Sequence, residues 1–315
     1  MDGLKVCFAG VGSIAKRHIR NLQTVCKTRE IEVQIDAFRS SSRTDEIEGL
    51  NTVYNNINDV PSDYDVIFIT NPTKFHLSTL RDFHEKGKNF FIEKPLSIID
   101  QLDDAHSFTL RDDAVYYVAG PLRYNAVIKY IKENVDPSDV ISIRCISSSY
   151  LPDWRPGQDY RETYSAQKAL GGGVSIDLVH EWDYLTFIFG QPQKVLYMAG
   201  KKSPLEIDTE DYAIYMAEYP DKIAEVHLDY FGRKTIREIQ LLMKEDTILG
   251  DLVNNRIFFM KSGKVIDLHE DRDDYQKREL EHFLNMISGI VPKEDGFHHA
   301  IKVLNLTQGK TSWRQ

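Results

Sequence analysis

The stretch Leu4-Lys5-Val6-Cys7-Phe8-Ala9-Gly10-Val11-Gly12-Ser13-Ile14-Ala15 decides the fold of this chain. Its first six residues predict a buried strand, the glycines predict a tight turn, and a helix is expected to begin at Ser13. Gly10 would permit the sharp change of direction, and Gly12 would let the backbone approach a pyrophosphate group closely. The sequence therefore predicts a dinucleotide site at the N-terminus of this helix, with a plain strand-to-helix turn as the alternative. The residues expected to contact the cofactor here are Gly10, Gly12, Ser13 and Ile14.

Strand and helix patterns alternate through the first 120 residues. Further strands are predicted at 31–38, 53–54, 66–70, 90–92 and 114–118, and helices at 13–26, 75–86 and about 98–110. Such alternation is typical of a doubly wound parallel sheet. We therefore predict an α/β protein whose N-terminal Rossmann domain spans residues 1–121.

The pattern changes after Gly120-Pro121, where strand candidates are joined by short polar breaks. Hairpins are predicted for 211–219 with 223–230 and for 257–260 with 265–268, and an amphipathic helix for 275–288. This run favours a large, open, mostly antiparallel sheet with helices on one face. A second α/β domain is therefore expected over residues 122–315.

The composition argues against several classes of function. The 315 residues include 39 Lys and Arg against 48 Asp and Glu, a formal net charge of −9, so no basic field is available to attract nucleic acid or an anionic membrane. No apolar run approaches the roughly 18–20 residues that cross a bilayer, and the first apolar stretch is too short for a signal peptide. The three cysteines show no metal-ligand spacing. We expect a cytoplasmic protein that binds neither nucleic acid nor membrane and holds no metal.

The end of the second predicted strand bears on which dinucleotide binds. An NAD site usually has an acidic residue there that accepts from the ribose 2′-hydroxyl, whereas a basic residue suits the 2′-phosphate of NADP. Here the strand leads into Arg39, Ser40 and Arg43, while the nearest acid, Asp36, lies three residues before Arg39. NADP is therefore the favoured cofactor and NAD the alternative, with Arg39, Ser40 and Arg43 as contacts of the 2′-phosphate. A solvated polar loop is the other interpretation of these residues.

Two loops are expected at the carboxyl edge of the same sheet, where open α/β sheets bind their ligands. The first is Thr70-Asn71-Pro72 with His76, and the second is Glu93-Lys94-Pro95, which follows the apolar run 89–92. A lysine beside a nicotinamide can hydrogen-bond a substrate hydroxyl and help its proton leave. Composition alone would make Lys94 a solvated surface residue, but this position favours a catalytic role. The cofactor contacts expected in these loops are Thr70, Asn71, Pro72, His76, Glu93 and Lys94.

A triple glycine, Gly171-Gly172-Gly173, leads into a predicted helix that carries Asp177 and His180. The two residues are three apart and are expected to share a helix face, where a carboxylate can orient an imidazole for proton transfer. The alternative is that Asp177 caps the helix and His180 is a partly buried histidine. His180-Glu181 begins like a zinc-protease motif, but Tyr184 stands where the second histidine belongs, so a metal site is not predicted.

The polar loop 154–161 carries aromatic residues and two arginines. Aromatic faces suit sugar rings and guanidinium groups suit carboxylates or phosphates, although an ordinary surface loop is equally compatible with the sequence. The candidates for substrate binding are Lys94, Arg123, Trp154, Arg155, Arg161, Asp177 and His180.

Taken together, four motifs resemble those of the glucose–fructose oxidoreductase/inositol dehydrogenase/MocA (Gfo/Idh/MocA) family of nicotinamide-dependent oxidoreductases. They are the G-x-G-x-I-A-x-x-H pattern of Gly10–His18, Asn71-Pro72-Thr73 with His76, Glu93-Lys94-Pro95, and the segment 171–183. The resemblance implies a Rossmann domain and a substrate-binding α/β domain, whose open sheet joins subunits into a homodimer or homotetramer. It also implies hydride transfer between NAD(P) and a sugar, sugar derivative or cyclitol. In that reaction Lys94 would polarise the reacting oxygen, Asp177 would support the substrate and the proton relay, and His180 would be the acid/base.

The sequence departs from the family in one spacing. Many members have the aspartate and histidine four residues apart, whereas Asp177 and His180 are three apart. This leaves open whether His180 or another group is the acid/base. Two other functions also stay open. One is a non-catalytic regulator that senses a dinucleotide on the same fold, and the other is a redox-neutral enzyme with tightly bound NAD.

Overall fold

The computed structural model describes residues 3–39 and 48–311 and divides into two compact units. The first unit comprises the chain up to Ala119 together with Asp273–Ile301. The second comprises Gly120–Arg272 together with the residues from Lys302 onward. The sequence predicts one division after residue 121, whereas the chain here returns to the first unit, because a late helix supplies part of that unit's core.

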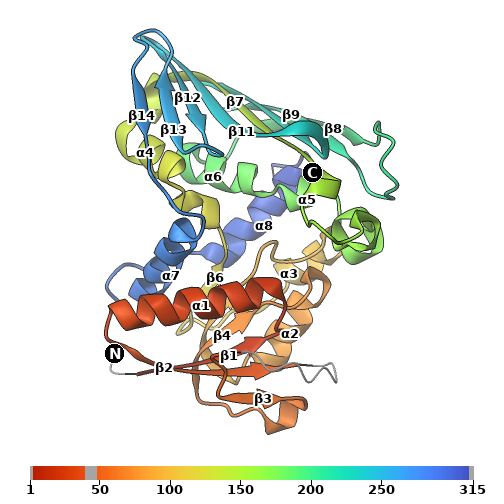
Figure 1. Ribbon diagram of the computed structural model, residues 1–315, viewed down its shortest axis with the longest axis vertical. Coiled ribbons are helices and arrows are strands. Elements are labelled where there is room, and N and C mark those ends of the chain that lie inside the picture. The colour runs from red at the N-terminus through yellow and green to blue at the C-terminus, as the bar shows by residue number, and fades with distance from the viewer. Residues whose placement is uncertain (1–2, 40–47, 312–315) are drawn as a thin grey trace. The chain divides into compact units, whose positions relative to one another are not determined.

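A six-stranded parallel sheet forms the centre of the first unit, in the order β3-β2-β1-β4-β5-β6 (Figure 1). This is the order of a doubly wound dinucleotide-binding sheet, so the predicted Rossmann architecture is confirmed. Because all strands are parallel, the carboxyl ends of β1, β4 and β5 meet at one edge. The strands are β1 (Gly3–Ala9), β2 (Glu32–Phe38), β3 (Thr52–Tyr54), β4 (Tyr64–Ile69), β5 (Gly87–Ile92) and β6 (Tyr116–Val118).

Aromatic side chains hold the middle of this sheet together. The rings of Phe8, Phe68 and Phe91 stack in a row across β1, β4 and β5, with centroids 4.4 and 5.0 Å apart. Phe283 of helix α7 (Asp274–Ile287) meets Phe91 edge-on at 5.3 Å, and α7 adds further apolar side chains to the same core. A helix from near the end of the chain therefore completes the core of the N-terminal sheet.

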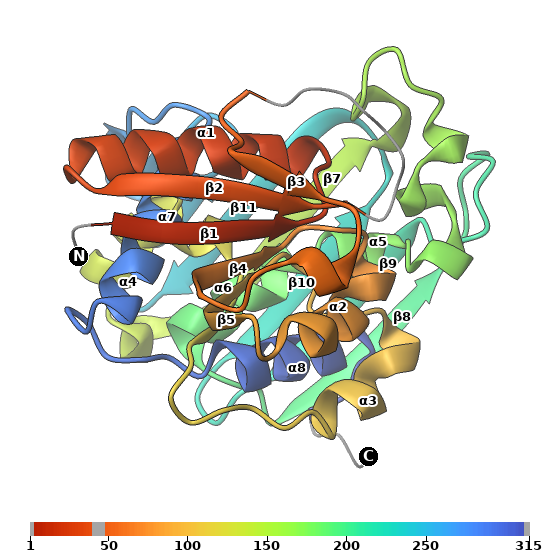
Figure 2. The ribbon, with the colours of Figure 1, turned by 90° about the horizontal axis from the view of Figure 1, so that it is seen from below.

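Helices cover both faces of the sheet, with α1 (Ser13–Thr28) on one side of the strands and α2 (His76–Phe83) on the other (Figure 2). Successive side chains of a strand point to opposite faces. Phe91 accordingly faces α7, which contacts α1, whereas Phe90 stacks on Tyr116 at 4.9 Å. Burial on both faces explains why the strands of this unit are almost continuously apolar.

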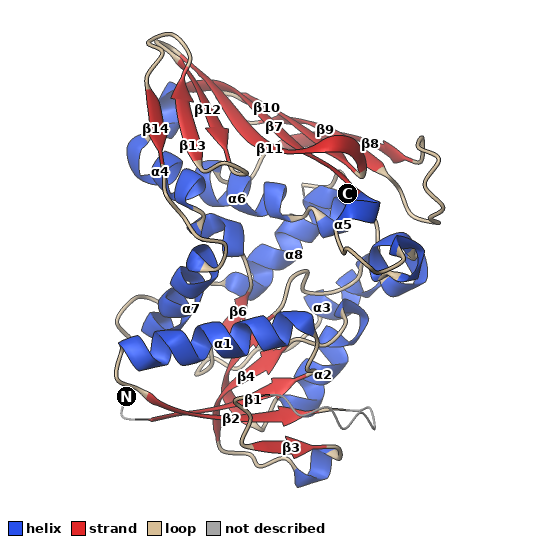
Figure 3. Ribbon diagram, in the orientation of Figure 1, coloured by secondary structure: helices blue, strands red, loops and turns tan. Residues whose placement is uncertain are grey.

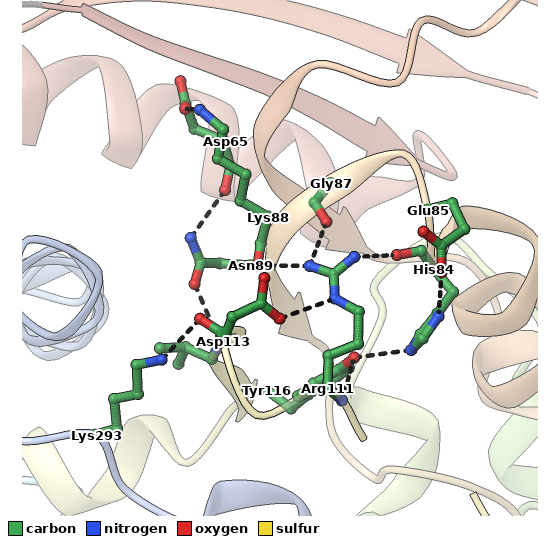
Figure 4. Close-up of polar contacts among 11 residues, drawn as sticks. Asp65, His84, Glu85, Gly87, Lys88, Asn89, Arg111, Asp113, Tyr116 and Lys293 are labelled. Carbon is green, nitrogen blue, oxygen red and sulfur yellow. Dashed lines mark hydrogen bonds and ion pairs between the residues drawn. The ribbon is translucent and has the colours of Figure 1, made fainter. Parts of the chain in front are cut away.

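The turn before β5 is fastened by Arg111 (Figure 4). Its guanidinium donates to the backbone oxygens of His84, Gly87 and Lys88 at 2.6, 2.9 and 3.1 Å. Its backbone N–H donates to the hydroxyl of Tyr116, at 3.2 Å, on the neighbouring strand β6. One residue therefore joins the end of α2, the start of β5 and the start of β6.

An eight-stranded sheet forms the second unit, in the order β14-β13-β12-β11-β7-β10-β9-β8 (Figure 3). Both predicted hairpins form, and every neighbouring pair is antiparallel except β7 with β10. The predicted mostly antiparallel sheet is therefore confirmed. The strands are β7 (Val140–Tyr150), β8 (Lys194–Gly200), β9 (Tyr212–Glu218), β10 (Ile223–Asp229), β11 (Phe231–Met243), β12 (Thr247–Asp251), β13 (Arg256–Phe259) and β14 (Val265–Asp267).

Helices lie against one face of the second sheet, where α4 contacts β12 and α5 contacts β9 and β10. The helices of this unit are α4 (Ala126–Asn134), α5 (Val174–Asp177) and α6 (His180–Phe189). On the other face Leu196, Met198 and Met216 are each more than half exposed, and Leu196 lies directly opposite Met216. The second sheet thus has a covered face and an open face with apolar side chains.

Two further helices complete the described chain. The helix predicted at about 98–110 is shorter than expected, because a 3-10 turn over Ile99–Gln101 precedes α3 (Leu102–His106). The last helix is α8 (Gly296–Thr307). Among residues 3–39 and 48–311, none of the helices combines the length and the apolar character that crossing a membrane requires.

Candidate active site

The glycine turn between β1 and α1 leaves room in front of a helix N-terminus. Gly10 has a positive φ of 96°, and a Cβ there would lie 2.6 Å from the backbone of Asn71. A Cβ at Gly12 would meet nothing within 4 Å in the described part of the chain, where no side chain caps the start of α1 either. The first N–H groups of α1 therefore face space that suits the pyrophosphate of a dinucleotide.

The loop after β4 is fastened to the glycine turn. The hydroxyl of Thr70 donates to the oxygen of Gly10 at 2.7 Å, and the ring nitrogens of buried His76 lie 2.8 Å from Asn71 O and 2.9 Å from Pro95 O. Burial lowers the pKa of His76 in spite of these two carbonyl groups, so the ring is neutral at pH 7 and donates to one of them. Thr70 and His76 thus hold the loop. The side-chain oxygen of Asn71 is buried and has no hydrogen-bond partner among the described residues.

Glu93 joins the end of β5 to helix α1. Its Oε1 lies 2.5 Å from Nε2 of buried His18, and its Oε2 accepts the backbone N–H of Lys94 at 3.1 Å. Burial raises the pKa of Glu93, but the hydrogen bond and charge of His18 outweigh burial, so the pKa is lowered overall. The two carboxylate oxygens therefore fix the backbone at the end of β5, directly before Lys94. The peptide bond between Lys94 and Pro95 is cis.

The end of β2 is described as far as Arg39. This residue is buried, and its backbone N–H donates to Tyr54 O at 2.9 Å. Asp36 is buried two residues before the end of the strand, where it accepts the hydroxyl of Tyr64 at 2.8 Å. Its carboxylate is therefore part of the core. Ser40 and Arg43, which the sequence predicts as phosphate contacts, lie outside the described residues.

The triple glycine of the second unit allows two close approaches. A Cβ at Gly172 would lie 2.0 Å from the backbone oxygen of Tyr164, and one at Gly173, where φ is 133°, would lie 2.3 Å from Oε1 of Glu210. That Glu210 oxygen accepts the backbone N–H and the hydroxyl of Ser175 at 3.3 and 2.6 Å. The glycines therefore let the start of α5 pack against Tyr164 and Glu210.

Asp177 and His180 lie on separate helices, which corrects the single helix predicted from the sequence. Helix α5 ends at Asp177, α6 begins at His180, and Leu178 between them has φ −96° and ψ 31°. The three-residue spacing therefore does not place them on one helix face. All six residues of 174–179 are buried, so the local pattern of apolar residues contains no sign of the break.

Two tyrosines surround the carboxylate of Asp177. The hydroxyl of buried Tyr230 donates to Oδ2 at 2.5 Å. Burial raises the pKa of Tyr164, and the negative charge of Asp177 raises that pKa further. Burial and then Asp177 likewise raise the pKa of Tyr230. Both phenols are therefore protonated at neutral pH, and Tyr230 donates to the carboxylate. Neither tyrosine is predicted from the sequence, because nothing in its local sequence marks it.

The loop after β7 contributes to the same surroundings. The indole of Trp154 meets the ring of Tyr230 edge-on at 5.2 Å. The guanidinium of Arg155 lies 5.3 Å from the ring centre of Tyr164. The structure thus gathers Trp154, Arg155 and Asp177, which are all predicted substrate contacts, around two tyrosines.

The other two predicted arginines are held in ion pairs. Arg123 donates from Nε and Nη2 to the carboxylate of Asp183 at 2.9 and 2.5 Å, in a buried position. Arg161 binds Asp159 and Glu206 at the surface. An anionic substrate would have to compete with these carboxylates. In the described part of the chain, no group of three or more His, Cys, Asp or Glu side chains is placed to hold a metal ion.

Both units match descriptions of known protein families. Residues 4–110 match "Oxidoreductase family, NAD-binding Rossmann fold", and residues 128–244 match "GFO/IDH/MocA C-terminal domain". YrbE of Bacillus subtilis, described as an uncharacterised oxidoreductase, is 26% identical over 196 residues. That match covers 61% of this chain and 55% of YrbE, so the chain spans about half the length of this relative.

Solved structures of low sequence identity share the fold of nearly the whole chain. A levoglucosan dehydrogenase in complex with NADH has a TM-score of 0.83 at 16% identity, over 98% of this chain and 95% of that one. A myo-inositol 2-dehydrogenase from Lactobacillus plantarum has a TM-score of 0.75 at 21% identity, over 97% and 95%. At these identities the likeness establishes the fold.

Proposed function

Because the chain belongs to the Gfo/Idh/MocA family of oxidoreductases, we propose that it transfers a hydride between a nicotinamide dinucleotide and a sugar, sugar derivative or cyclitol. One observation carries the proposal: Glu93 fixes the backbone of Lys94 directly after β5, at the edge where such sheets bind their ligands. The substrate class is supported by neighbours in fold that are named as levoglucosan and myo-inositol dehydrogenases.

The residues of the first unit fit a dinucleotide. The open space at Gly12, the uncapped start of α1 and the unpartnered buried oxygen of Asn71 all belong to the same edge of the sheet. When bound, the nicotinamide would accept or donate the hydride. The residues proposed to hold the dinucleotide are Gly10, Gly12, Ser13, Ile14, Thr70, Asn71, Pro72, His76, Glu93 and Lys94.

NADP is the proposed dinucleotide, and NAD is the alternative. Asp36 is committed to Tyr64 within the core, whereas Arg39 directly follows β2, with Ser40 and Arg43 close by in sequence. A basic residue at this strand end favours a 2′-phosphate. The test compares the Kd values of NAD and NADP for wild type and Arg39→Ala. We expect a loss confined to NADP, and an equal loss for both would remove the argument.

Three side chains are proposed to act on the substrate. Lys94 would donate a hydrogen bond to the reacting oxygen and polarise it. Asp177 would support the substrate and accept a proton, and His180 is the family's acid/base candidate. Trp154 and Arg155 are proposed to contact the sugar. Trp154 packs on Tyr230, which donates to Asp177, and Arg155 lies over the ring of Tyr164. Arg123 and Arg161 would bind substrate only by leaving their present ion pairs.

The open face of the second sheet is proposed to join subunits into a homodimer or homotetramer. Exposed Leu196, Met198 and Met216 give this face an apolar surface. Apolar patches of this kind commonly mark protein interfaces. Light scattering on wild type and Met216→Lys tests the proposal, because a charge at the centre of an interface should produce monomers.

The main experiment incubates the protein with NAD or NADP and a panel of sugars, sugar derivatives and cyclitols. Net formation of reduced dinucleotide, measured by its near-ultraviolet absorbance, is the expected result. Tight dinucleotide binding with no turnover of any compound would support a sensing regulator instead. Product formation without net reduced dinucleotide would support a redox-neutral enzyme.

A further inference from the structure

The loop that follows β7 lines a small hollow. All of the residues around it belong to one stretch of the second unit, residues 151–165. The hollow has room for about one water-sized group, such as a single oxygen atom of a ligand. Its polar and aromatic lining residues are Trp154, Arg155, Gln158, Tyr160, Thr163 and Ser165. Aromatic rings, one cation and several hydroxyl groups therefore surround a space the size of one oxygen atom.

Three of these side chains are held by hydrogen bonds within the second unit. The indole N–H of Trp154 donates to Oγ of Ser149 at 2.9 Å, and the hydroxyl of Thr163 donates to the backbone oxygen of Tyr160 at 2.7 Å. The hydroxyl of Tyr160 accepts the backbone N–H of Glu206 at 3.1 Å. These hydrogen bonds therefore fix the wall of the hollow in one geometry.

Ser165 contributes a hydroxyl group to the hollow. The residue is 1% exposed, and its Oγ has no hydrogen-bond partner in the described part of the chain. Its backbone oxygen accepts the hydroxyl of buried Thr209 at 3.0 Å, so the residue is held in place. A buried hydroxyl without a partner costs free energy. An oxygen atom of a ligand would remove that cost by accepting a hydrogen bond from Ser165.

Arg155 contributes a positive charge that no carboxylate neutralises among residues 3–39 and 48–311. Its guanidinium carbon lies 5.3 Å from the ring centre of Tyr164, which orients the cation, and the side chain is partly exposed. Arg161 of the same loop differs, because it binds both Asp159 and Glu206. Arg155 can therefore receive an anion without displacing a carboxylate of the protein.

We propose that Arg155 and Ser165 bind a carboxylate or phosphate group of the substrate, so that the protein acts on an anionic sugar or cyclitol. This inference rests on the proposed function and names the substrate class within it. Guanidinium groups bind both kinds of oxyanion, and one oxygen of either kind matches the size of the hollow. The net charge of −9 gives the protein no general attraction for anions, so binding depends on this local cation.

The kinetic test pairs each neutral compound of the panel with its carboxylate and its phosphate ester. Glucose, for example, is compared with glucuronate and glucose 6-phosphate. The wild type is expected to have a higher kcat/KM for one anionic member than for the neutral one, and the preferred member identifies the group as carboxylate or phosphate. Preference for the neutral member of every pair would overturn the proposal.

Arg155→Met is expected to lower kcat/KM for the anionic substrate about 10–100-fold, mainly through KM, and to leave the neutral compound unaffected. Arg155→Lys should restore part of the loss, because it keeps the charge but not the planar donor group. Arg233→Met is the matched control, since Arg233 also lies over a tyrosine ring, 3.8 Å from the centre of Tyr150, and does not line the hollow. Equal losses for the neutral and anionic compounds in Arg155→Met would overturn the proposal.

Ser165→Ala separates binding from stability. The variant should unfold at the same urea concentration as the wild type or a higher one, because the hydroxyl has no hydrogen bond within the described chain to lose. Its kcat/KM for the anionic substrate should fall severalfold. A lower urea midpoint with an unchanged kcat/KM would show that the hydroxyl serves the fold, and would overturn its assignment to the substrate.

A further test needs no turnover. Phenylglyoxal modifies arginine side chains, and peptide mass spectrometry gives the rate at each arginine. Glucuronate or glucose 6-phosphate should slow the modification of Arg155, whereas glucose should not. Arg233 is the internal control, because no anion is expected to protect it.

The modification test separates the inference from the proposed function. Equal modification of Arg155 with and without both anions would overturn the anion site, whether or not a substrate is found. Protection of Arg155 without turnover of any compound would support the anion site and contradict the sugar-dehydrogenase function. Protection together with a selective loss of anionic turnover in Arg155→Met is the outcome that supports both.

Discussion

The two ends of strand β5 both carry charged side chains in close contact, but their partners differ. At the amino end, Arg111 donates to three backbone oxygens, and the nearby charges of Lys88 and Asp113 are 70% and 82% exposed. At the carboxyl end, Glu93 and His18 are both buried and contact each other, and Glu93 also accepts the backbone N–H of Lys94.

The two ends of β5 differ in what their contacts achieve. Contacts at the amino end join elements of the fold, whereas contacts at the carboxyl end hold the backbone of a candidate site residue. A cation that binds main-chain oxygens of a strand and a helix end gives stability and can lie far from any chemistry. Burial of a carboxylate costs free energy, and here one oxygen of the buried Glu93 holds the backbone of Lys94, whose side chain is partly exposed. We infer that the amino end of β5 serves the fold and the carboxyl end serves the reaction.

The largest expected effect is that of Lys94→Met. It should lower kcat about 10²–10⁴-fold, because the hydrogen bond to the reacting oxygen is lost, and urea unfolding checks that the variant is folded. Lys88→Met, at the other end of the same strand, is the matched control and should keep full activity. Full-rate turnover by Lys94→Met would break the distinction between the two ends.

Arg111→Ala should show the opposite pattern. Loss of the charged hydrogen bonds to the His84, Gly87 and Lys88 oxygens is expected to lower the free energy of unfolding by about 1.5–3 kcal/mol. The kcat of the folded protein should not change. A normal urea midpoint, or a large fall in kcat, would contradict a purely structural role.

Glu93→Gln should have a smaller effect that depends on pH. The pKa of Glu93 is lowered from its ordinary 4.5, so its ionised form stabilises the fold above that value and this contribution is lost as pH falls through the folded pKa. The variant should be about 1 kcal/mol less stable at pH 7, with the difference shrinking below about pH 4.5. Urea unfolding at several pH values measures this, and a constant difference would argue against an ionised Glu93.

Lys88→Ala is expected to have the smallest effect. Its ion pair with Asp65 spans 2.7 Å, but the lysine is mostly exposed. Exposed pairs of this kind contribute about 0.2–1 kcal/mol, and less at high salt. A loss as large as that of Arg111→Ala would mean that the amino end of β5 depends on its surface charges as well.

The sequence predicts the first unit well because its signals are local. Gly10 and Gly12 mark the turn, apolar runs mark strands buried on both faces, and the charged triplet at Glu93 follows a strand directly. Topology then places Lys94 at the ligand edge without knowledge of any contact. The partner of Glu93 could not be predicted in this way, because His18 is 75 residues away in the sequence.

The second unit is predicted less completely because its site depends on distant contacts. Tyr230 reaches Asp177 across 53 residues, and the oxygen of Tyr164 explains why Gly172 is a glycine. The break between α5 and α6 is hidden among residues that are all buried. Periodicity cannot reveal such features, since they arise from packing between elements.

Helix α7 has a consequence for the synthesis of the protein. Its Leu280, Phe283, Leu284 and Met286 belong to the same core as Val6, Phe68 and Phe91. A ribosome makes the six strands of the first sheet long before α7. The apolar face on which α7 packs therefore stays uncovered until residue 287 has emerged. The nascent chain therefore cannot complete the fold of its first unit before most of the second unit has been synthesised. A chain shortened to residues 1–121 is expected to aggregate, whatever dinucleotide is supplied to it.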